Sequence, residues 1–230
     1  IGVERWKVTG KIPSIPKDEK NVQRFIESKI NESLNNLKIP FFESILIHNP
    51  NDFVTHNANQ IVNGLRQIKT KGFVKKIGVS VYQKSELDHC LNYFEPDVVQ
   101  FPLNLLDNRF IEDNYLTTGN RQGIEVHIRS IFLQGILAAP LNVQPSVLKK
   151  WPLIWSYWGN WLKRNNICPV EASTRFAMNL DRINKVVVGV NNIKQLKQII
   201  KFSKKPPLPM HPNWPNKLDT NLLDPRMWNK

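Results

Sequence analysis

Polar side chains follow several short apolar segments of this sequence, at the point where each segment ends. In chain order they are Lys11, His48, Ser80, Gln100, Arg129 with Ser130, and Gly189 with Asn191. Together they offer a cation, a neutral imidazole that can hydrogen-bond, and amide donors. The last pair precedes the start of a predicted helix, whose free N–H groups can bind an anion. If these side chains meet, they predict one polar site.

Each residue of this set also has an ordinary structural interpretation. A lysine near a strand end, such as Lys11, is commonly solvated, and His48 before an Asn-Pro pair can simply cap a turn. Gln100 is harder to explain in this way, because it interrupts an apolar run just before Phe101. The chain shows no cysteine nucleophile, Ser-His-Asp spacing, carboxylate pair or metal-ligand spacing, so we expect no metal site.

Short apolar runs typical of buried strands alternate with amphipathic segments. The runs lie at residues 6–12, 44–47, 76–80, 97–101, 124–129 and 185–190. Helical spacing of apolar residues predicts helices at about 18–38, 56–70, 85–94, up to about 122, 145–165, 169–180 and 193–202. Regular alternation of this kind is typical of a parallel sheet covered by helices.

The turn after the first strand distinguishes two architectures for such a sheet. An open doubly wound sheet can have six strands, but its first strand–helix turn carries a glycine-rich phosphate loop. Here residues 11–16 read KIPSIP and contain no glycine. We therefore predict an α/β fold, a (β/α)8 TIM barrel that lacks its first two βα units and retains six parallel strands. The strand-end residues would then share its C-terminal face, where such barrels carry their chemistry.

The predicted barrel domain spans residues 1–202 and is incomplete, and a Pro-rich tail at 203–230 packs on it. In the tail, Met210, His211 and Trp214 either contribute to a substrate pocket or belong to a strap over the barrel.

Two further aromatic features favour structural roles. Trp151, Trp155 and Trp158 share one helix face, which favours a core stripe over a wall at the substrate mouth or a subunit contact. His127 lies inside a predicted strand and is interpreted as a core histidine.

Composition excludes several classes of protein. With 230 residues, 41% hydrophobic and 22% charged, the chain is not collagen-like, disordered or a disulfide scaffold. No apolar run approaches the roughly 20 residues of a membrane helix. Cys90 and Cys168 are interpreted as buried thiols and favour a cytoplasmic protein. The net charge of +13 suits a polyanion such as nucleic acid, but 22 Lys and 26 Asn spread along the chain favour a compositional origin. We expect no nucleic-acid or membrane partner.

Six phrases at the strand ends carry a resemblance to a known family. They are VTGK at 8–11, LIHNP at 46–50, IGVSVY at 77–82, VVQFPLNLLD at 98–107, VHIRSIFLQG at 126–135 and VVVGVN at 186–191. In this order and spacing, the sequence resembles the aldo-keto reductase family over essentially its whole length. The closing DPRMW at 224–228 is similar to the end of a branch often associated with bacterial surface-polysaccharide genes.

The resemblance implies a barrel that binds a nicotinamide dinucleotide, NADP(H) or alternatively NAD(H). It implies hydride transfer to a small carbonyl substrate, such as an aldehyde or ketone of a sugar derivative. Lys11 would lower the pKa of a tyrosine acid and His48 would orient the carbonyl. The implied cofactor residues are Ser80 and Gln100 at the carboxamide, Arg129 at the nicotinamide ring, Ser130, Phe132 and Gln134 at the pyrophosphate, and Gly189, Asn191 and Gln195 at the adenosine phosphates.

Two departures from the family pattern qualify these expectations. The family's catalytic aspartate and tyrosine lie before the position that aligns with Ile1, so we expect an N-terminally truncated chain with little or no reductase activity. Gln195 lies near the place where NADP-specific members often have an arginine, with Lys194 and Lys197 as alternative cations. Two functions are alternatives to the reductase. The first is a non-catalytic nucleotide-binding barrel module, or pseudoenzyme, and the second is nucleic-acid binding.

Overall fold

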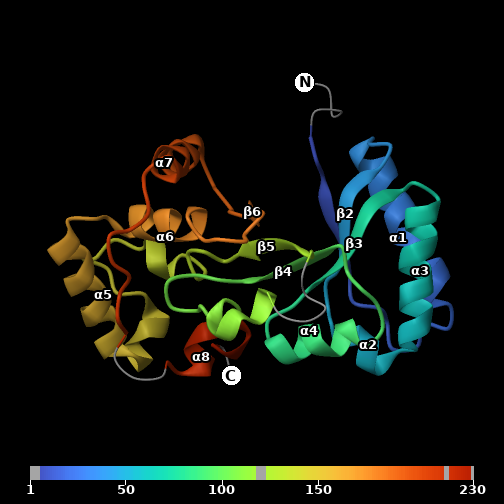
Figure 1. Cartoon of the computed structure of the whole chain (residues 1–230), viewed down its shortest axis with the longest axis horizontal. Coiled ribbons are helices and arrows are strands. Elements are labelled where there is room, and N and C mark those ends of the chain that lie inside the picture. The colour runs from blue at the N-terminus through green and yellow to red at the C-terminus, as the bar shows by residue number, and fades with distance from the viewer. Residues whose placement is uncertain (1–5, 118–122, 215–217, 229–230) are drawn as a thin grey trace. The chain divides into compact units, whose positions relative to one another are not determined.

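A single sheet with the strand order β1-β2-β3-β4-β5-β6 organises the chain (Figure 1). The computed structural model describes residues 6–117, 123–214 and 218–228. The strands are β1 Thr9–Ile12, β2 Phe42–Ile47, β3 Val74–Ser80, β4 Val98–Pro102, β5 Glu125–Arg129 and β6 Lys185–Val186. Each strand neighbours the next in sequence, as in a barrel built from successive βα units. The predicted α/β class with six parallel strands is confirmed.

The helices fall between the strands as the periodicity predicts. The α-helices are α1 Val22–Leu37, α2 Asp52–Thr55, α3 Ala58–Thr70, α4 Lys84–Leu91, α5 Pro152–Asn165, α6 Pro169–Met178, α7 Ile193–Ser203 and α8 Thr220–Leu223. Short 3₁₀ segments are η2 Glu112–Thr117, η4 Ile136–Ala138, η5 Ser146–Lys150 and η6 Pro225–Met227. The chain divides into two compact units, of which unit 1 is Ile1–Phe101 with Asp113–His127 and unit 2 is Pro102–Glu112 with Ile128–Lys230.

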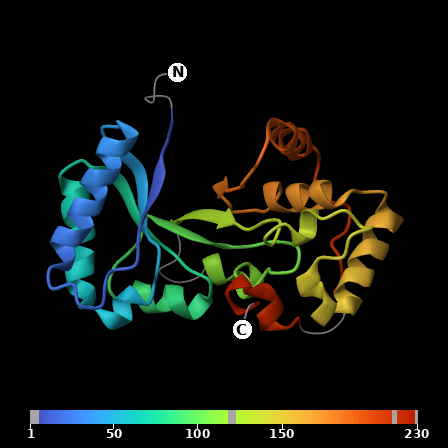
Figure 2. The same ribbon diagram turned by 180° about the vertical axis from the view of Figure 1, so that it is seen from behind.

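In unit 1, parallel pairing places apolar residues in one row across four strands. Ile12 is paired with Ile47, and Ile47 with Val79, which is paired with Val99. All four are at most 1% exposed. Helices α1 and α3 lie side by side along this unit, as both views show (Figures 1 and 2). A Cβ at Gly64 would lie 3.0 Å from the Ile26 side chain, so this glycine lets the two helices approach closely.

In unit 2, helices α5, α6 and α7 pack with the tail. Trp214 donates a hydrogen bond from Nε1 to the Leu105 carbonyl (2.6 Å) and lies against Trp158. His211 lies edge-on to Phe176 of α6, and Met210 is 67% exposed. These contacts favour the strap interpretation of the tail.

Several predicted element boundaries and one predicted burial are wrong. Residues 145–165 are not one helix, because Pro152 excludes the helical conformation at Trp151, so η5 ends before α5 begins. The first strand starts at Thr9 rather than at residue 6, and the last ends at Val186 rather than at 190. Residues 52–55 add helix α2 before α3. The helix expected up to 122 is a 3₁₀ segment to Thr117, and residues 118–122 lie outside the described chain. Cys168 is exposed, because it precedes α6 at its N-cap position.

Candidate functional site

Four predicted site residues of unit 1 lie on one face of the sheet at the C-terminal ends of its strands. Ser80 is the register partner of Gln100, and His48 follows Ile47, the partner of Val79. Lys11 is paired with Leu46, two residues before His48, and side chains two apart on a strand share a face. Lys11 and His48 are exposed, whereas Ser80 and Gln100 are each 2% exposed. The strand ends therefore present a cation and an imidazole to solvent above a buried polar pair.

The buried Gln100 carries an unsatisfied polar atom. Its Oε1 has no hydrogen-bond partner among the described residues. A buried carbonyl oxygen without a donor costs about 1–3 kcal/mol, so such an atom is expected where a ligand supplies the donor. A primary carboxamide has two N–H donors of the required kind.

Asp52 holds the two loops that follow Lys11 and His48, and the sequence pattern did not identify it. Its Oδ2 accepts a hydrogen bond from the Ile15 backbone N–H (3.1 Å) and its Oδ1 accepts one from Asn49 Nδ2 (3.0 Å). Burial raises the pKa of Asp52 above its usual value, and the bond from Ile15 and the charge of His56 offset this only in part. An aspartate directly after a Pro-Asn turn was the available signal.

In unit 2, the loop after β5 is held in an unusual backbone conformation. Ser130, Leu133, Gln134 and Gly135 all have positive φ, at 60°, 44°, 54° and 91°. For the three non-glycine residues this conformation costs on the order of 1–3 kcal/mol each, and such strain clusters at functional sites. Left-handed residues in turns form concave sets of backbone N–H groups that bind anions.

Asn104 fixes this loop from within the core. The sequence pattern placed it in the phrase at 98–107 but did not predict this role. It is fully buried, and its Oδ1 accepts hydrogen bonds from the N–H groups of Leu106 and Asp107, each 3.0 Å long. Its Nδ2 donates to the Ser130 carbonyl (3.2 Å). An asparagine within an otherwise apolar phrase was the signal for this role.

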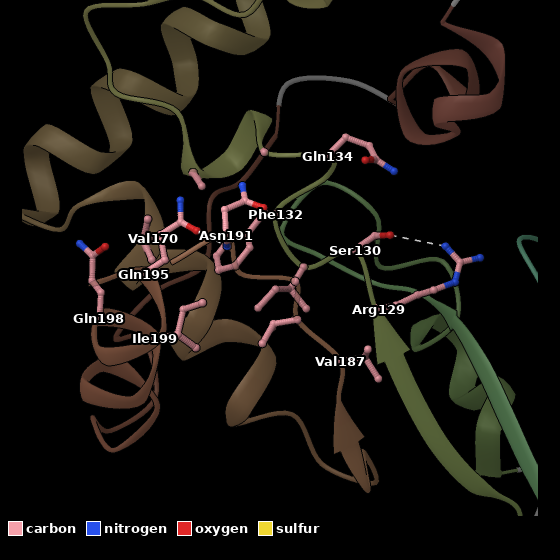
Figure 3. A pocket seen from close by; sticks show the side chains of 15 residues that line it. Arg129, Ser130, Phe132, Gln134, Val170, Val187, Asn191, Gln195, Gln198 and Ile199 are labelled. Atoms are coloured by element: carbon pink, nitrogen blue, oxygen red, sulfur yellow. Dashed lines mark hydrogen bonds between the residues drawn. The ribbon is translucent and has the colours of Figure 1, made fainter. Parts of the chain in front are cut away.

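The loop forms one side of a cavity of about 620 Å³ in unit 2 (Figure 3). The other side comes from the β6–α7 connection and α7, because Val187 N–H donates to the Ile128 carbonyl (2.8 Å) and sets β6 beside β5. Seven predicted cofactor residues line it: Arg129, Ser130, Phe132, Gln134, Gly189, Asn191 and Gln195. Gln198 lines it too and was not predicted. Volumes of 300–1,000 Å³ are typical of small-molecule sites.

Hydrogen bonds order the α7 side of this cavity. Asn192 caps the helix by accepting a bond from Gln195 N–H (2.9 Å), and Gln195 Oε1 accepts one from Asn191 N–H (2.8 Å). On the opposite side, Arg129 Nη1 donates to Ser130 Oγ (3.4 Å). The cavity thus combines a guanidinium, a helix N-terminus and a concave loop, all of which favour anions.

Other ionisable groups have structural roles rather than places in these two sites. His127 is 1% exposed and bonds through Nε2 to Glu125 Oε1 (2.7 Å), which confirms a core histidine. Glu125 also pairs with Lys76 and raises the pKa of that lysine. Within the described ranges, no cluster of His, Cys, Asp and Glu could hold a metal ion. Over the same ranges, every helix is too short or too polar to cross a membrane.

Comparison with known proteins decides the family. The family model described as "Aldo/keto reductase family" matches residues 4–211. The chain belongs to this family. The aldo-keto reductase AKR11C1 from Bacillus halodurans has a similar fold, with a TM-score of 0.67 and 16% identity for its apo form and 0.66 and 17% for its holo form. The aligned regions cover 88% and 87% of this chain and 67% of each structure. No curated protein matches significantly.

The aldo-keto reductase family uses nicotinamide cofactors and acts on small carbonyl substrates. Two features of the structure fit parts of such a dinucleotide. The unsatisfied Gln100 carbonyl fits the donors of a carboxamide, and the anion-favouring cavity fits a diphosphate.

Proposed function

We propose that the protein is a reductase that transfers hydride from NAD(P)H to the carbonyl carbon of a small aldehyde or ketone, a class that includes sugar derivatives. The observation that carries this proposal is the cavity of unit 2, which gathers seven residues predicted for the cofactor. In the proposed complex, Ser80 and Gln100 bind the carboxamide. Arg129 stacks on the nicotinamide ring, and the loop at 130–135 and the start of α7 bind the phosphates.

Lys11 and His48 have the proposed catalytic roles. The bound dinucleotide supplies the hydride. The His48 imidazole donates a hydrogen bond to the carbonyl oxygen, where negative charge develops, and so orients the substrate. The Lys11 ammonium favours the ionised form of a nearby tyrosine acid and so lowers its pKa. Both side chains are exposed at the strand ends and can reach a substrate from solvent.

For these 230 residues alone, we propose dinucleotide binding with little or no turnover. The resemblance assigns the proton donor and the catalytic aspartate to no residue of these 230. We also propose that residues 1–202 form the barrel domain and 203–230 its tail. We propose a cytoplasmic location, because exposed thiols such as Cys168 stay reduced there.

Fluorescence titration of the 230-residue chain with NADH and NADPH tests the binding part. We expect binding that weakens at least tenfold in Arg129→Ala, and no change in Arg164→Ala, a matched substitution at an exposed position of α5. Absence of binding by either dinucleotide would refute the proposal.

Turnover is tested with the full product of the gene that encodes this chain, against a panel of aldehydes and sugar-derived ketones. We expect oxidation of the dinucleotide that Lys11→Met abolishes. Binding without turnover in that gene product would instead identify a non-catalytic nucleotide-binding module.

A further inference from the structure

The cavity of unit 2 carries little formal charge. Of the 15 described residues that line it, Arg129 alone is charged, and the others are apolar residues, glycines, amides and a serine. The roughly half charge at the N-terminus of α7 and the N–H groups of the loop at 130–135 suit one diphosphate, and the Arg129 guanidinium is the one formal charge in the same wall. A further phosphate monoester brings about −1.5 to −2 charge and needs another cation in the wall.

The wall on the α7 side consists of neutral amides. Gln195 and Gln198 lie with Ile199 on the same side of the helix and line the cavity (Figure 3). Because Gln195 Oε1 accepts from Asn191 N–H, its Nε2 is oriented as a neutral donor. Such groups match ribose hydroxyls, which both donate and accept, but do not compensate the desolvation of a dianion.

The lysines of α7 do not supply the missing cation in this structure. Lys194, Lys197 and Lys201 are exposed and absent from the cavity lining. Lys194 and Lys201 lie about one turn on either side of Gln198, and Lys197 lies on nearly the opposite side of the helix from Gln195. Exposed lysines in water contribute only about 0–1 kcal/mol to an ion pair.

We propose that this cavity selects an unphosphorylated ribose, so that the protein binds NAD(H) more tightly than NADP(H), with Gln195 and Gln198 as specificity-determining residues. The inference rests on the proposed function and deepens it, because it specifies which dinucleotide the same site takes. It concerns binding, and its test does not depend on turnover.

Equilibrium titrations of the 230-residue chain test this selectivity. NADH and NADPH are compared by nicotinamide fluorescence, and ADP-ribose and its 2′-phosphorylated form by calorimetry. We expect the unphosphorylated member of each pair to bind at least about fivefold tighter. Gln198→Arg, which leaves the Gln195 hydrogen bond intact, is expected to tighten NADPH at least about tenfold and NADH little. Gln198→Lys repeats the test with a second cation, and Lys197→Gln is the control and leaves both affinities within twofold.

Three outcomes would overturn the inference. The first is equal or tighter binding of NADPH by the unaltered chain. The second is a tenfold or greater loss of NADPH binding in Lys194→Gln, which would show that this lysine supplies the cation. The third is no binding of either dinucleotide, which would remove the proposed function as well, whereas the first two outcomes leave it intact.

Discussion

Replacing Gln100 by leucine separates stability from binding at the strand ends. Gln100 is 2% exposed, and its Oε1 has no partner among the described residues. Burying that carbonyl unpaired costs about 1–3 kcal/mol, and leucine of similar size removes the cost. We therefore expect Gln100→Leu to stabilise the dinucleotide-free protein by about 1–2 kcal/mol. For a chain of this size, this raises Tm by roughly 2–8 °C.

The same substitution is expected to weaken dinucleotide binding. Leucine cannot accept a hydrogen bond from the carboxamide, and loss of one such bond in a buried site costs about 1–3 kcal/mol, or roughly 5- to 150-fold in Kd. Thermal unfolding followed by circular dichroism measures the first effect, and NADH fluorescence titration measures the second. Gln67→Leu makes the same chemical change at an exposed position of α3 and should alter stability by no more than about 0.5 kcal/mol. A Gln100→Leu protein that is less stable, or that binds NADH as tightly as before, would refute the reasoning.

Three further substitutions or reactions test other parts of the structure. Asn104→Ala removes three hydrogen bonds and should lower the free energy of unfolding in urea by about 2–4 kcal/mol. It should also weaken dinucleotide binding, since Asn104 holds the Ser130 carbonyl, and unchanged binding would show that this loop does not contribute to the site. Burial alone would raise the pKa of Asp224, but hydrogen bonds from Arg226 outweigh it and hold that pKa below its usual value. The Asp224 carboxylate therefore stabilises the fold above about pH 4 and loses this effect as pH falls through its folded pKa. The cost of Asp224→Asn, about 1 kcal/mol at pH 7, should therefore vanish once the pH lies below that folded pKa. Cys168 is exposed while burial raises the pKa of Cys90 to about 12, so one thiol should react with Ellman's reagent in the native protein and two after denaturation; two fast thiols would contradict the structure.

The sequence predicted which polar residues lie at the C-terminal ends of the strands, because an apolar run that ends in a polar residue is a local pattern. It could not predict that Ser80 and Gln100 are register partners, since register depends on how whole strands align. It predicted residues on both sides of the cavity in unit 2 but missed Gln198. Helix α7 has polar residues over much of its surface, so the pattern does not mark the side that faces the cavity.

The loop at 130–135 shows why part of the site is not visible in sequence. Ser130, Leu133 and Gln134 are residue types that rarely take positive φ, so no local preference indicates the observed conformation. Interactions with distant residues impose it, among them the hydrogen bond from Asn104. By contrast, the break between η5 and α5 had a local cause in Pro152 and was predictable from it.

Some of the unfavourable contributions to folding lie at the ends of the strands, in the loop at 130–135 and at Gln100. The positive φ of Ser130, Leu133 and Gln134 opposes folding, and so does the buried Gln100 carbonyl, which has no partner among the described residues. Together they cost several kcal/mol, a large part of a typical net stability of about 5–15 kcal/mol. In the core of unit 1, by contrast, Ile12, Ile47, Val79 and Val99 are packed without exposure beyond 1%. A ligand present at a hundred times its Kd stabilises the folded state by about 2.7 kcal/mol, which offsets much of such a cost. If a dinucleotide satisfies this carbonyl, one fixed NADH concentration of about a hundred times the Kd of the unaltered chain should raise the Tm of that chain markedly. The same concentration should raise the Tm of Gln100→Leu less, because the lost hydrogen bond raises its Kd.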